Sequence, residues 1–183
     1  MGAIVKGFER SNPLFSLCGL NCGLCSMRLG GHCSGCGYGN QSCRIARCSI
    51  EHGKPEYCFL CNEYPCPKYD GIDEYDSFIT HKNQKSDLTK AQSIGIDAYN
   101  CEQTEKAKLL NILLSDYNAG REKTLYCLAV NLLEAHDIKA VLEKAEADLN
   151  PDGLSLKEKA TYVSDLLRKT AKTKSIELKL RKK

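Results

Sequence analysis

Apolar residues recur at helical spacing through the C-terminal part of the chain. The segment EQTEKAKLLNILLSDYN places Leu109, Leu113 and Tyr117 on one stripe, which is the spacing of an α-helix with one buried face. Asn100 is the predicted N-cap of this helix, and Gly120 is its predicted end. The pattern therefore predicts a long amphipathic helix in the middle of the chain.

Three more helices are predicted after Gly120. The segment REKTLYCLAVNLLEAH carries apolar residues at helix-face positions, namely Leu125, Leu128, Ala129, Leu132 and Leu133. Asp137 is the predicted N-cap of the next helix, whose apolar face is Ile138, Val141, Leu142 and Ala145. Ser155 and Glu158 form a capping-box pattern before a helix that carries Leu156, Ala160, Val163 and Leu167. The final SIELKLRKK alternates apolar and basic residues, which leaves a short strand and an irregular tail both open.

The N-terminal part of the chain has a different character. Residues 18–67 hold most of the cysteine and glycine, in turn-like pieces such as GGHCSGCGYGN that favour neither a long helix nor a strand. Because this segment is poor in aliphatic residues, we expect no hydrophobic core of its own and predict cross-linking by metal or sulfur. The predicted fold is a small α-plus-irregular protein. A metal-stabilised, loop-dominated region (residues 1–70) packs on a small helical bundle (residues 71–183) with a basic C-terminal tail.

Cysteine is the unusual component of the composition. The chain has 183 residues and 12 cysteines, and ten of these fall between residues 18 and 66: Cys18, Cys22, Cys25, Cys33, Cys36, Cys43, Cys48, Cys58, Cys61 and Cys66. No secretory signal and no apolar run of membrane-spanning length is present, so we predict a cytoplasmic protein without membrane contact. In a reducing compartment such a set of thiols favours metal ligation over disulfides.

Three C-x2-C pairs define the candidate metal centre, and they are Cys22/Cys25, Cys33/Cys36 and Cys58/Cys61. Two thiolates at this spacing reach one metal ion from a single turn, and a structural zinc site takes four such ligands. Ten cysteines fill two four-thiolate sites and leave two over, so two zinc sites are predicted. Several pairings satisfy the same spacings, and the assignment of cysteines to sites stays open.

An iron–sulfur cluster is the alternative cofactor, because clusters also use closely spaced thiolates. Cys18, Cys22 and Cys25 read C-x3-C-x2-C, which resembles the cluster-binding signature of radical S-adenosylmethionine enzymes, and Cys66-Pro67 resembles the end of a bacterial ferredoxin run. The chain lacks the βα alternation of the radical enzymes and the full ferredoxin run. Zinc is therefore favoured, with iron–sulfur kept as the alternative.

The cysteine motifs also carry a family resemblance. CGLNCGLC, GHCSGC, CRIARC and CFLCNEYPC, in that order, resemble the cysteine-rich bacterial and archaeal proteins catalogued as domain of unknown function 3795. The resemblance covers about residues 14–70, and more weakly the REKTLYCLAVNLL helix. It implies metal binding through these cysteines, and it implies no reaction.

No catalytic constellation is present, since the sequence contains neither a Ser/His/Asp order nor an H-E-x-x-H motif. The first hypothesis is a structural zinc protein that binds an unknown macromolecular partner, because four thiolates leave zinc no open position for water. An iron–sulfur redox or electron-transfer protein is the alternative. A small zinc enzyme with one open coordination position is a second alternative, so an enzymatic role stays open but is not favoured.

Charge adds little to this picture. The formal net charge is +3, and eight basic residues lie between Arg168 and Lys183. That tail could contact nucleic acid, but it has no aromatic residue for base stacking. A solvated basic end is the favoured interpretation.

Overall fold

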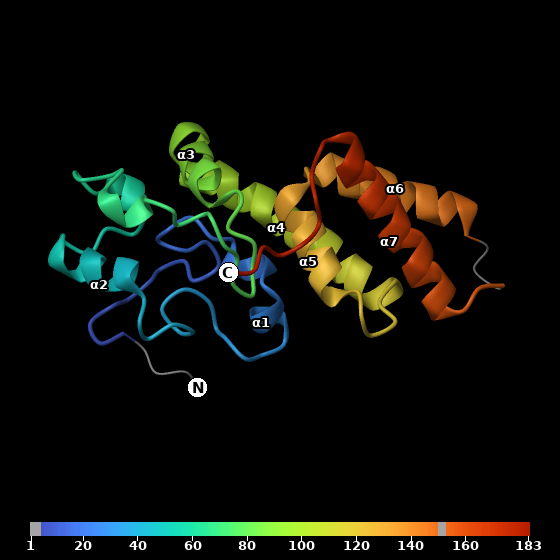
Figure 1. Ribbon diagram of the computed structural model, residues 1–183, viewed down its shortest axis with the longest axis horizontal. Coiled ribbons are helices and arrows are strands. Elements are labelled where there is room, and N and C mark those ends of the chain that lie inside the picture. Colours follow the sequence, from blue (N-terminus) through green and yellow to red (C-terminus); the bar gives the residue numbers. More distant parts are fainter. Residues whose placement is uncertain (1–4, 150–152) are drawn as a thin grey trace. The chain divides into compact units, whose positions relative to one another are not determined.

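The computed structural model describes residues 5–149 and 153–183, and its regular elements are helices and 3₁₀ turns (Figure 1). In chain order they are η1 (Cys22–Leu24), α1 (Ser26–Leu29), α2 (Arg44–Glu51), η2 (Cys58–Leu60), η3 (Pro67–Tyr69), α3 (Gln84–Ile94), α4 (Ile96–Asp116), α5 (Lys123–Leu132), α6 (Ala135–Asp148) and α7 (Leu156–Thr173). No strand forms in these two ranges, and the SIELKLRKK segment is irregular. The predicted helical and irregular class, with a cysteine-rich N-terminal half, is confirmed.

The chain divides into two compact units. The first unit runs to Gln103 and also includes Leu180–Lys183, and the second unit is Thr104–Lys179. The cysteine-rich segment lies in the first unit together with α3 and the beginning of α4. The ten cysteines of the candidate centre therefore belong to one compact unit.

The first unit has a hydrophobic core, but residues 18–67 contribute only Ile45, Ala46 and Tyr57 to it, in keeping with the expectation that this segment has no core of its own. The buried cluster of the unit is rich in aromatic residues and consists of Val5, Phe8, Phe15, Leu17, Ile45, Ala46, Tyr57, Tyr69, Leu88, Ala91 and Tyr99. Leu88, Ala91 and Tyr99 come from α3 and α4, beyond the cysteine-rich segment. The cysteine-rich segment thus packs its few apolar side chains on residues that precede and follow it, and burial of these side chains contributes to the stability of the unit.

The loop after Cys18 packs closely on α3. Gly19 has a φ of +96°, and a Cβ atom at this position would lie 2.2 Å from the Gln84 carbonyl oxygen and 2.7 Å from Leu88 Cγ. The Gln84 side-chain amide donates a hydrogen bond of 3.1 Å to the carbonyl oxygen of Cys18. Only glycine permits this approach, so α3 fixes the backbone that carries the first cysteine.

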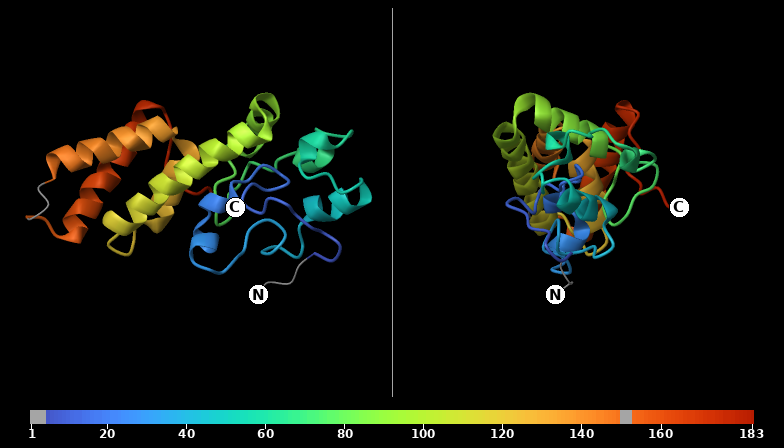
Figure 2. Two further views of the ribbon diagram at one scale, coloured as in Figure 1. Left: turned by 180° about the vertical axis from the view of Figure 1, so that it is seen from behind. Right: turned by 90° about the vertical axis from the view of Figure 1, so that its left-hand side faces the viewer.

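The second unit is helical. In Figure 1 and in the left panel of Figure 2, α6 and α7 lie side by side, and α5 contacts both. Every residue of α5 from Leu125 to Leu132 is buried, so this helix is a core helix rather than the amphipathic helix predicted. Cys127 is buried within it, as expected of a cysteine that packs as a small apolar residue.

The helix starts in the second unit confirm one prediction and correct another. Ser155 caps α7, and its capping box with Glu158 is formed in both directions, as predicted. The N-cap of α6 is Glu134, and Asp137 occupies the third helical position, where its carboxylate accepts from the Glu134 N–H. Asp137 is therefore the reciprocal partner in a capping box, not the cap itself.

Candidate metal centre

Two of the three C-x2-C pairs fold into the same backbone turn. In η1 the N–H of Cys25 donates to the carbonyl oxygen of Cys22 at 3.2 Å, and in η2 the N–H of Cys61 donates to that of Cys58 at 2.9 Å. The closing cysteines have nearly equal backbone angles, with φ/ψ of −87°/135° at Cys25 and −84°/136° at Cys61. A 3₁₀ turn of this kind places the first and last cysteine of the motif near each other.

The Cys33/Cys36 pair is held differently. The Cys33 sulfur accepts from the Gly35 N–H at 3.4 Å, and the Cys36 N–H donates to the Pro13 carbonyl oxygen at 2.9 Å. Gly35 has a φ of +114°, and a Cβ there would lie 2.3 Å from the same Pro13 oxygen. The N-terminal segment, rather than a local turn, therefore positions Cys36.

A first group of thiols lies at the start of the cysteine-rich segment. Burial raises the pKa of Cys22 well above its ordinary value, and the charges of Cys36, Cys18, Cys25 and Cys33, in decreasing order, raise it further. The pKa of Cys36 is raised to about 12, also chiefly by burial. Cys18, Cys22 and Cys36 are half-buried, and the charge of Cys18 contributes to the raised pKa of both other thiols.

Cys43 and the outer thiols complete this part of the unit. The charge of Cys43 contributes to the raised pKa of Cys18, and the Cys43 sulfur accepts from the Ala46 N–H at the start of α2. Cys25 and Cys33 have other contacts, since the Cys25 sulfur is 4.0 Å from the Phe78 carbonyl oxygen and the Cys33 sulfur is 3.5 Å from the Gly35 carbonyl oxygen, so we leave both outside the first group. We define the first group as Cys18, Cys22, Cys36 and Cys43.

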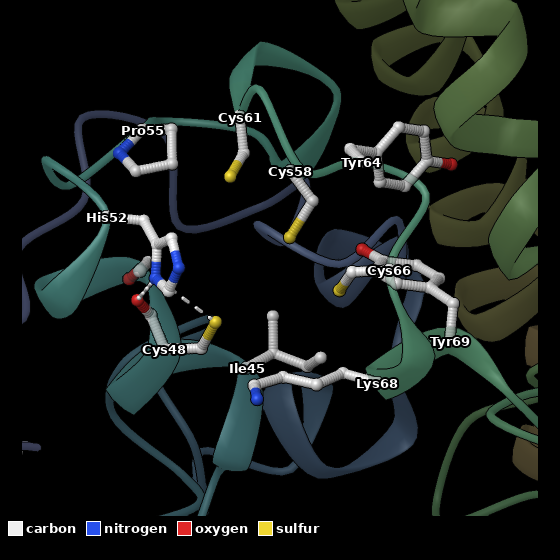
Figure 3. A pocket seen from close by; sticks show the side chains of 11 residues that line it. Ile45, Cys48, His52, Pro55, Cys58, Cys61, Tyr64, Cys66, Lys68 and Tyr69 are labelled. Atoms are coloured by element: carbon white, nitrogen blue, oxygen red, sulfur yellow. Dashed lines mark hydrogen bonds between the residues drawn. The ribbon is translucent and has the colours of Figure 1, made fainter.

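A second group of thiols surrounds a small cavity. Cys48, Cys58, Cys61 and Cys66 line a space of about 20 Å³, and Figure 3 shows the four sulfur atoms around it. These residues come from α2, from η2 and from the residue that precedes η3. A cavity of this volume has room for about one water-sized sphere. We define the second group as these four cysteines.

The electrostatics of the second group follow from burial. Burial raises the pKa of Cys58 to about 12, the nearby Tyr69 hydroxyl opposes this rise, and the charges of Cys18, Cys66 and Cys48 add to it. The pKa of Cys48 is also raised, chiefly by partial burial. The charge of Lys68 opposes this rise, and the charges of Cys66 and Cys61 add to it. Thiols in such surroundings are protonated near neutral pH, and a coordinated metal ion is the kind of charge that deprotonates them.

His52 lies at the edge of this cavity, but both of its ring nitrogens already face acceptors. Nδ1 is 2.8 Å from the Cys48 carbonyl oxygen and 3.5 Å from the Cys48 sulfur, while Nε2 is 3.2 Å from a Glu63 carboxylate oxygen. These contacts raise the pKa of His52, first through the Cys48 carbonyl and then through Glu63. The ring is therefore placed as a donor beside Cys48 and not as a free metal ligand.

Aromatic side chains lie in and next to the second group, and Tyr64 and Tyr69 line its cavity. Tyr57 stacks on Phe59 with ring centroids 5.4 Å apart, and Tyr64 meets Tyr69 edge-on at 5.1 Å. A wider cleft of about 440 Å³ shares Tyr64, Cys66 and Tyr69 with the cavity. The second group is thus shielded by tyrosines and reached from a cleft on the Cys66 side.

The thiols are grouped without forming a finished coordination shell. In residues 5–149 and 153–183, no three histidine, cysteine, aspartate or glutamate side chains are arranged so that they could hold a metal ion. All twelve cysteines are free thiols. The donor type and number suit zinc or an iron–sulfur cluster, but the sulfurs would have to shift to bind either one.

Sequence reasoning found the ten cysteines and missed the residues that hold them. It did not identify Gln84, which bonds to the backbone of Cys18, or Asn21, whose amide bonds to Asp87 and whose side-chain oxygen accepts from the buried Tyr99 hydroxyl at 3.1 Å. These contacts join positions more than 60 residues apart, and no local pattern encodes them. Tyr69 could have been identified from the sequence, since it lies three residues after Cys66 in an aromatic-rich motif.

The comparisons with known proteins give no relative: no family model, no curated protein and no solved structure matches the chain. Within the part of the chain that the structure describes, no helix has the length and apolar character needed to cross a membrane.

Proposed function

We propose that the first unit is a thiolate metal-binding module that holds two zinc ions, one in each group of four cysteines. The observation that carries this proposal is the second group, in which four thiols from three separate elements line one cavity of about 20 Å³. A cavity of that volume suits a single ion. Four thiolates close the coordination shell of zinc, so the proposed sites are structural and hydrolyse nothing.

Metal binding is proposed to be coupled to local ordering. Since no preformed three-ligand group exists in the described residues, the ion would draw the thiols of each group together. The turn η2 supplies Cys58 and Cys61 to the second group from one backbone turn, and this pair would change least. The aromatic core of the unit would hold the remaining segments near their bound positions.

The role that we propose for the whole protein is interaction with a macromolecular partner in a reducing, cytoplasmic compartment. Free thiols at all twelve cysteines are consistent with that compartment. The order of the four cysteine motifs further supports membership of the family catalogued as domain of unknown function 3795, which we also propose.

An iron–sulfur redox protein is the second candidate, and one observation favours it. Thiolates that bind a multi-iron cluster lie further apart than thiolates on one ion, and the thiols here do not converge as a single-ion site does. An open three-ligand zinc site in an enzyme has no comparable support.

Metal analysis with an ultraviolet–visible spectrum, on protein purified without oxygen, tests the proposal. We expect colourless protein with two zinc ions per chain. Brown protein with iron and acid-labile sulfide would replace zinc by the iron–sulfur alternative. Protein that neither carries zinc nor takes it up after reduction of its thiols would overturn the metal-binding proposal.

A further inference from the structure

Tyr69 lines the cavity of the second group, and packing alone does not explain why this residue carries a hydroxyl. Tyr69 ends the turn η3 and is only 4% exposed. The edge of the Tyr64 ring fixes its orientation at a centroid distance of 5.1 Å. A phenylalanine would fill the same space, so the hydroxyl needs its own reason.

The hydroxyl of Tyr69 has no partner at hydrogen-bonding geometry within the protein. Figure 3 shows it pointing to the side of the cavity where the sulfurs of Cys58 and Cys66 lie, and Tyr69 and both cysteines line that cavity. The Tyr64 hydroxyl, in the same view, points away from the sulfurs. A buried hydroxyl without an acceptor is unfavourable, and a protonated thiol is a weak acceptor.

We propose that Tyr69 is a positioning residue for the bound metal, donating a hydrogen bond from its hydroxyl to the Cys58 thiolate. This inference rests on the proposed function, because the thiolate exists only when metal is bound. A thiolate is a charged acceptor, so this hydrogen bond is stronger than any that the free thiol accepts. The bond satisfies the buried hydroxyl and withdraws electron density from the sulfur.

Neighbouring groups do not fill this role. His52 approaches the cavity from the α2 side and contacts Cys48, and its other ring nitrogen faces Glu63. The charge of Lys68 acts on Cys48, whose pKa it lowers. On the η2 side of the cavity, among the residues that the structure describes, Tyr69 supplies the donor directed at Cys58.

The experiment compares Tyr69→Phe with Tyr64→Phe in the full chain. Each variant loses one hydroxyl and keeps its ring, so the edge-on ring contact is retained. Zinc affinity is measured by competition with a chelator, and the binding step of the second group is identified as the step abolished by Cys58→Ser. Cobalt(II) is then added in place of zinc, and the sulfur-to-metal charge-transfer band is recorded.

We expect Tyr69→Phe to bind the same number of zinc ions as the wild type. The zinc affinity of the second group should fall about tenfold, as is typical when a hydrogen bond to a metal ligand is removed. Its cobalt band should move to longer wavelength, because the sulfur loses a donor and its electrons become easier to transfer. Tyr64→Phe should change neither quantity. A purely structural role for the hydroxyl would not move the band of a folded, metal-loaded protein.

If the wild type binds zinc, and Tyr69→Phe has the same zinc affinity and the same cobalt band as the wild type, this inference alone would be overturned. A wild type that binds neither zinc nor cobalt would overturn the proposed function and this inference with it. Equal shifts in both tyrosine variants would show a general effect of ring polarity and would also overturn the inference.

Discussion

Asp76 and Arg181 are 105 residues apart in sequence and are joined by four hydrogen bonds in the first unit, one of them from the Asp76 N–H to the Arg181 carbonyl oxygen at 2.9 Å. The Arg181 backbone N–H donates to Asp76 Oδ2 at 2.7 Å, and its guanidinium donates to Oδ2 at 3.3 Å and to Oδ1 at 2.8 Å. The Asp76 side chain is fully buried. The last residues of the chain therefore belong to the unit that carries the cysteines, although the basic tail was predicted to be a solvated end.

Replacing Arg181 with alanine should lower the free energy of unfolding of the first unit. The substitution removes the two guanidinium hydrogen bonds and leaves the buried carboxylate with backbone donors, namely the N–H of residue 181 and the His81 N–H, each at 2.7 Å. Loss of charge-assisted hydrogen bonds of this kind costs about 2 kcal/mol. Urea unfolding followed by tyrosine fluorescence measures the change. Lys182→Ala, at an exposed neighbouring position, is the control and should be neutral.

Acid should remove the same stabilisation. Burial would raise the pKa of Asp76, but hydrogen bonds from Arg181 and His81 outweigh burial and lower it from 3.8 to about 2. A lowered folded-state pKa means that the contribution is fully present above about pH 4 and is lost as pH falls toward 2. Unfolding measured between pH 5 and pH 2 should show this loss in the wild type. In Asp76→Asn the loss of unfolding free energy between pH 5 and pH 2 should be smaller. An equal loss in both proteins would show that protonation of Asp76 is not its cause.

Gly19→Ala should destabilise the first unit more than Gly31→Ala. Both glycines have positive φ, +96° and +73°, so both substitutions carry a backbone cost of about 1–2 kcal/mol. A methyl group at residue 31 meets no atom within 4 Å, whereas one at residue 19 meets the Gln84 carbonyl oxygen. That overlap should add about 1–3 kcal/mol. Thermal unfolding of the two variants checks the order, and equal midpoints would argue against close packing of this loop on α3.

Cys58→Ser should remove one zinc ion per chain and leave the other. Cys101→Ser is the matched control, because Cys101 is exposed on α4 and belongs to neither group. Metal content after exhaustive dialysis measures both. Loss of zinc in the Cys101 variant, or retention of two ions in the Cys58 variant, would show that the grouping of thiols is wrong.

Chelator should change the first unit while the helices of the second unit survive. Thr104–Lys179 contains no candidate ligand cysteine, and its core is formed by apolar faces of α5, α6 and α7. Because metal-bound loops depend on the ion, near-ultraviolet dichroism of the tyrosines should fall after chelation. Most of the ellipticity at 222 nm should remain. A parallel loss of both signals would mean that the two units unfold together.

The sequence predicted those features whose cause is local. Ser155 and Glu158 are three residues apart, and their capping box formed as predicted. The buried faces of α4 and α6 follow from helical periodicity, and Leu109, Leu113 and Ile138 are indeed buried. Leu156 was expected on the apolar face of α7, yet it is 47% exposed, because it is the first residue of the helix.

Features with a distant cause were missed. Asn100 was predicted as the N-cap of a helix that actually begins at Ile96, where the Tyr99 N–H bonds to the Gly95 carbonyl oxygen. The added turn buries Tyr99 completely against Phe15, with ring centroids 4.6 Å apart. For the same reason, spacing alone could not assign Cys36 to the first group, since Pro13 positions it.

The shared shape of η1 and η2 hides an asymmetry between their middle residues. A Cβ on Gly23 would lie 3.3 Å from Leu14 Cβ, whereas the corresponding Phe59 stacks freely on Tyr57. Leu14 therefore limits the size of the residue in the middle of the first turn, whereas the middle residue of the second turn adds a ring that packs against the core of the unit. Two turns with the same backbone thus differ in what their middle residue does, and one accommodates its surroundings while the other anchors to them.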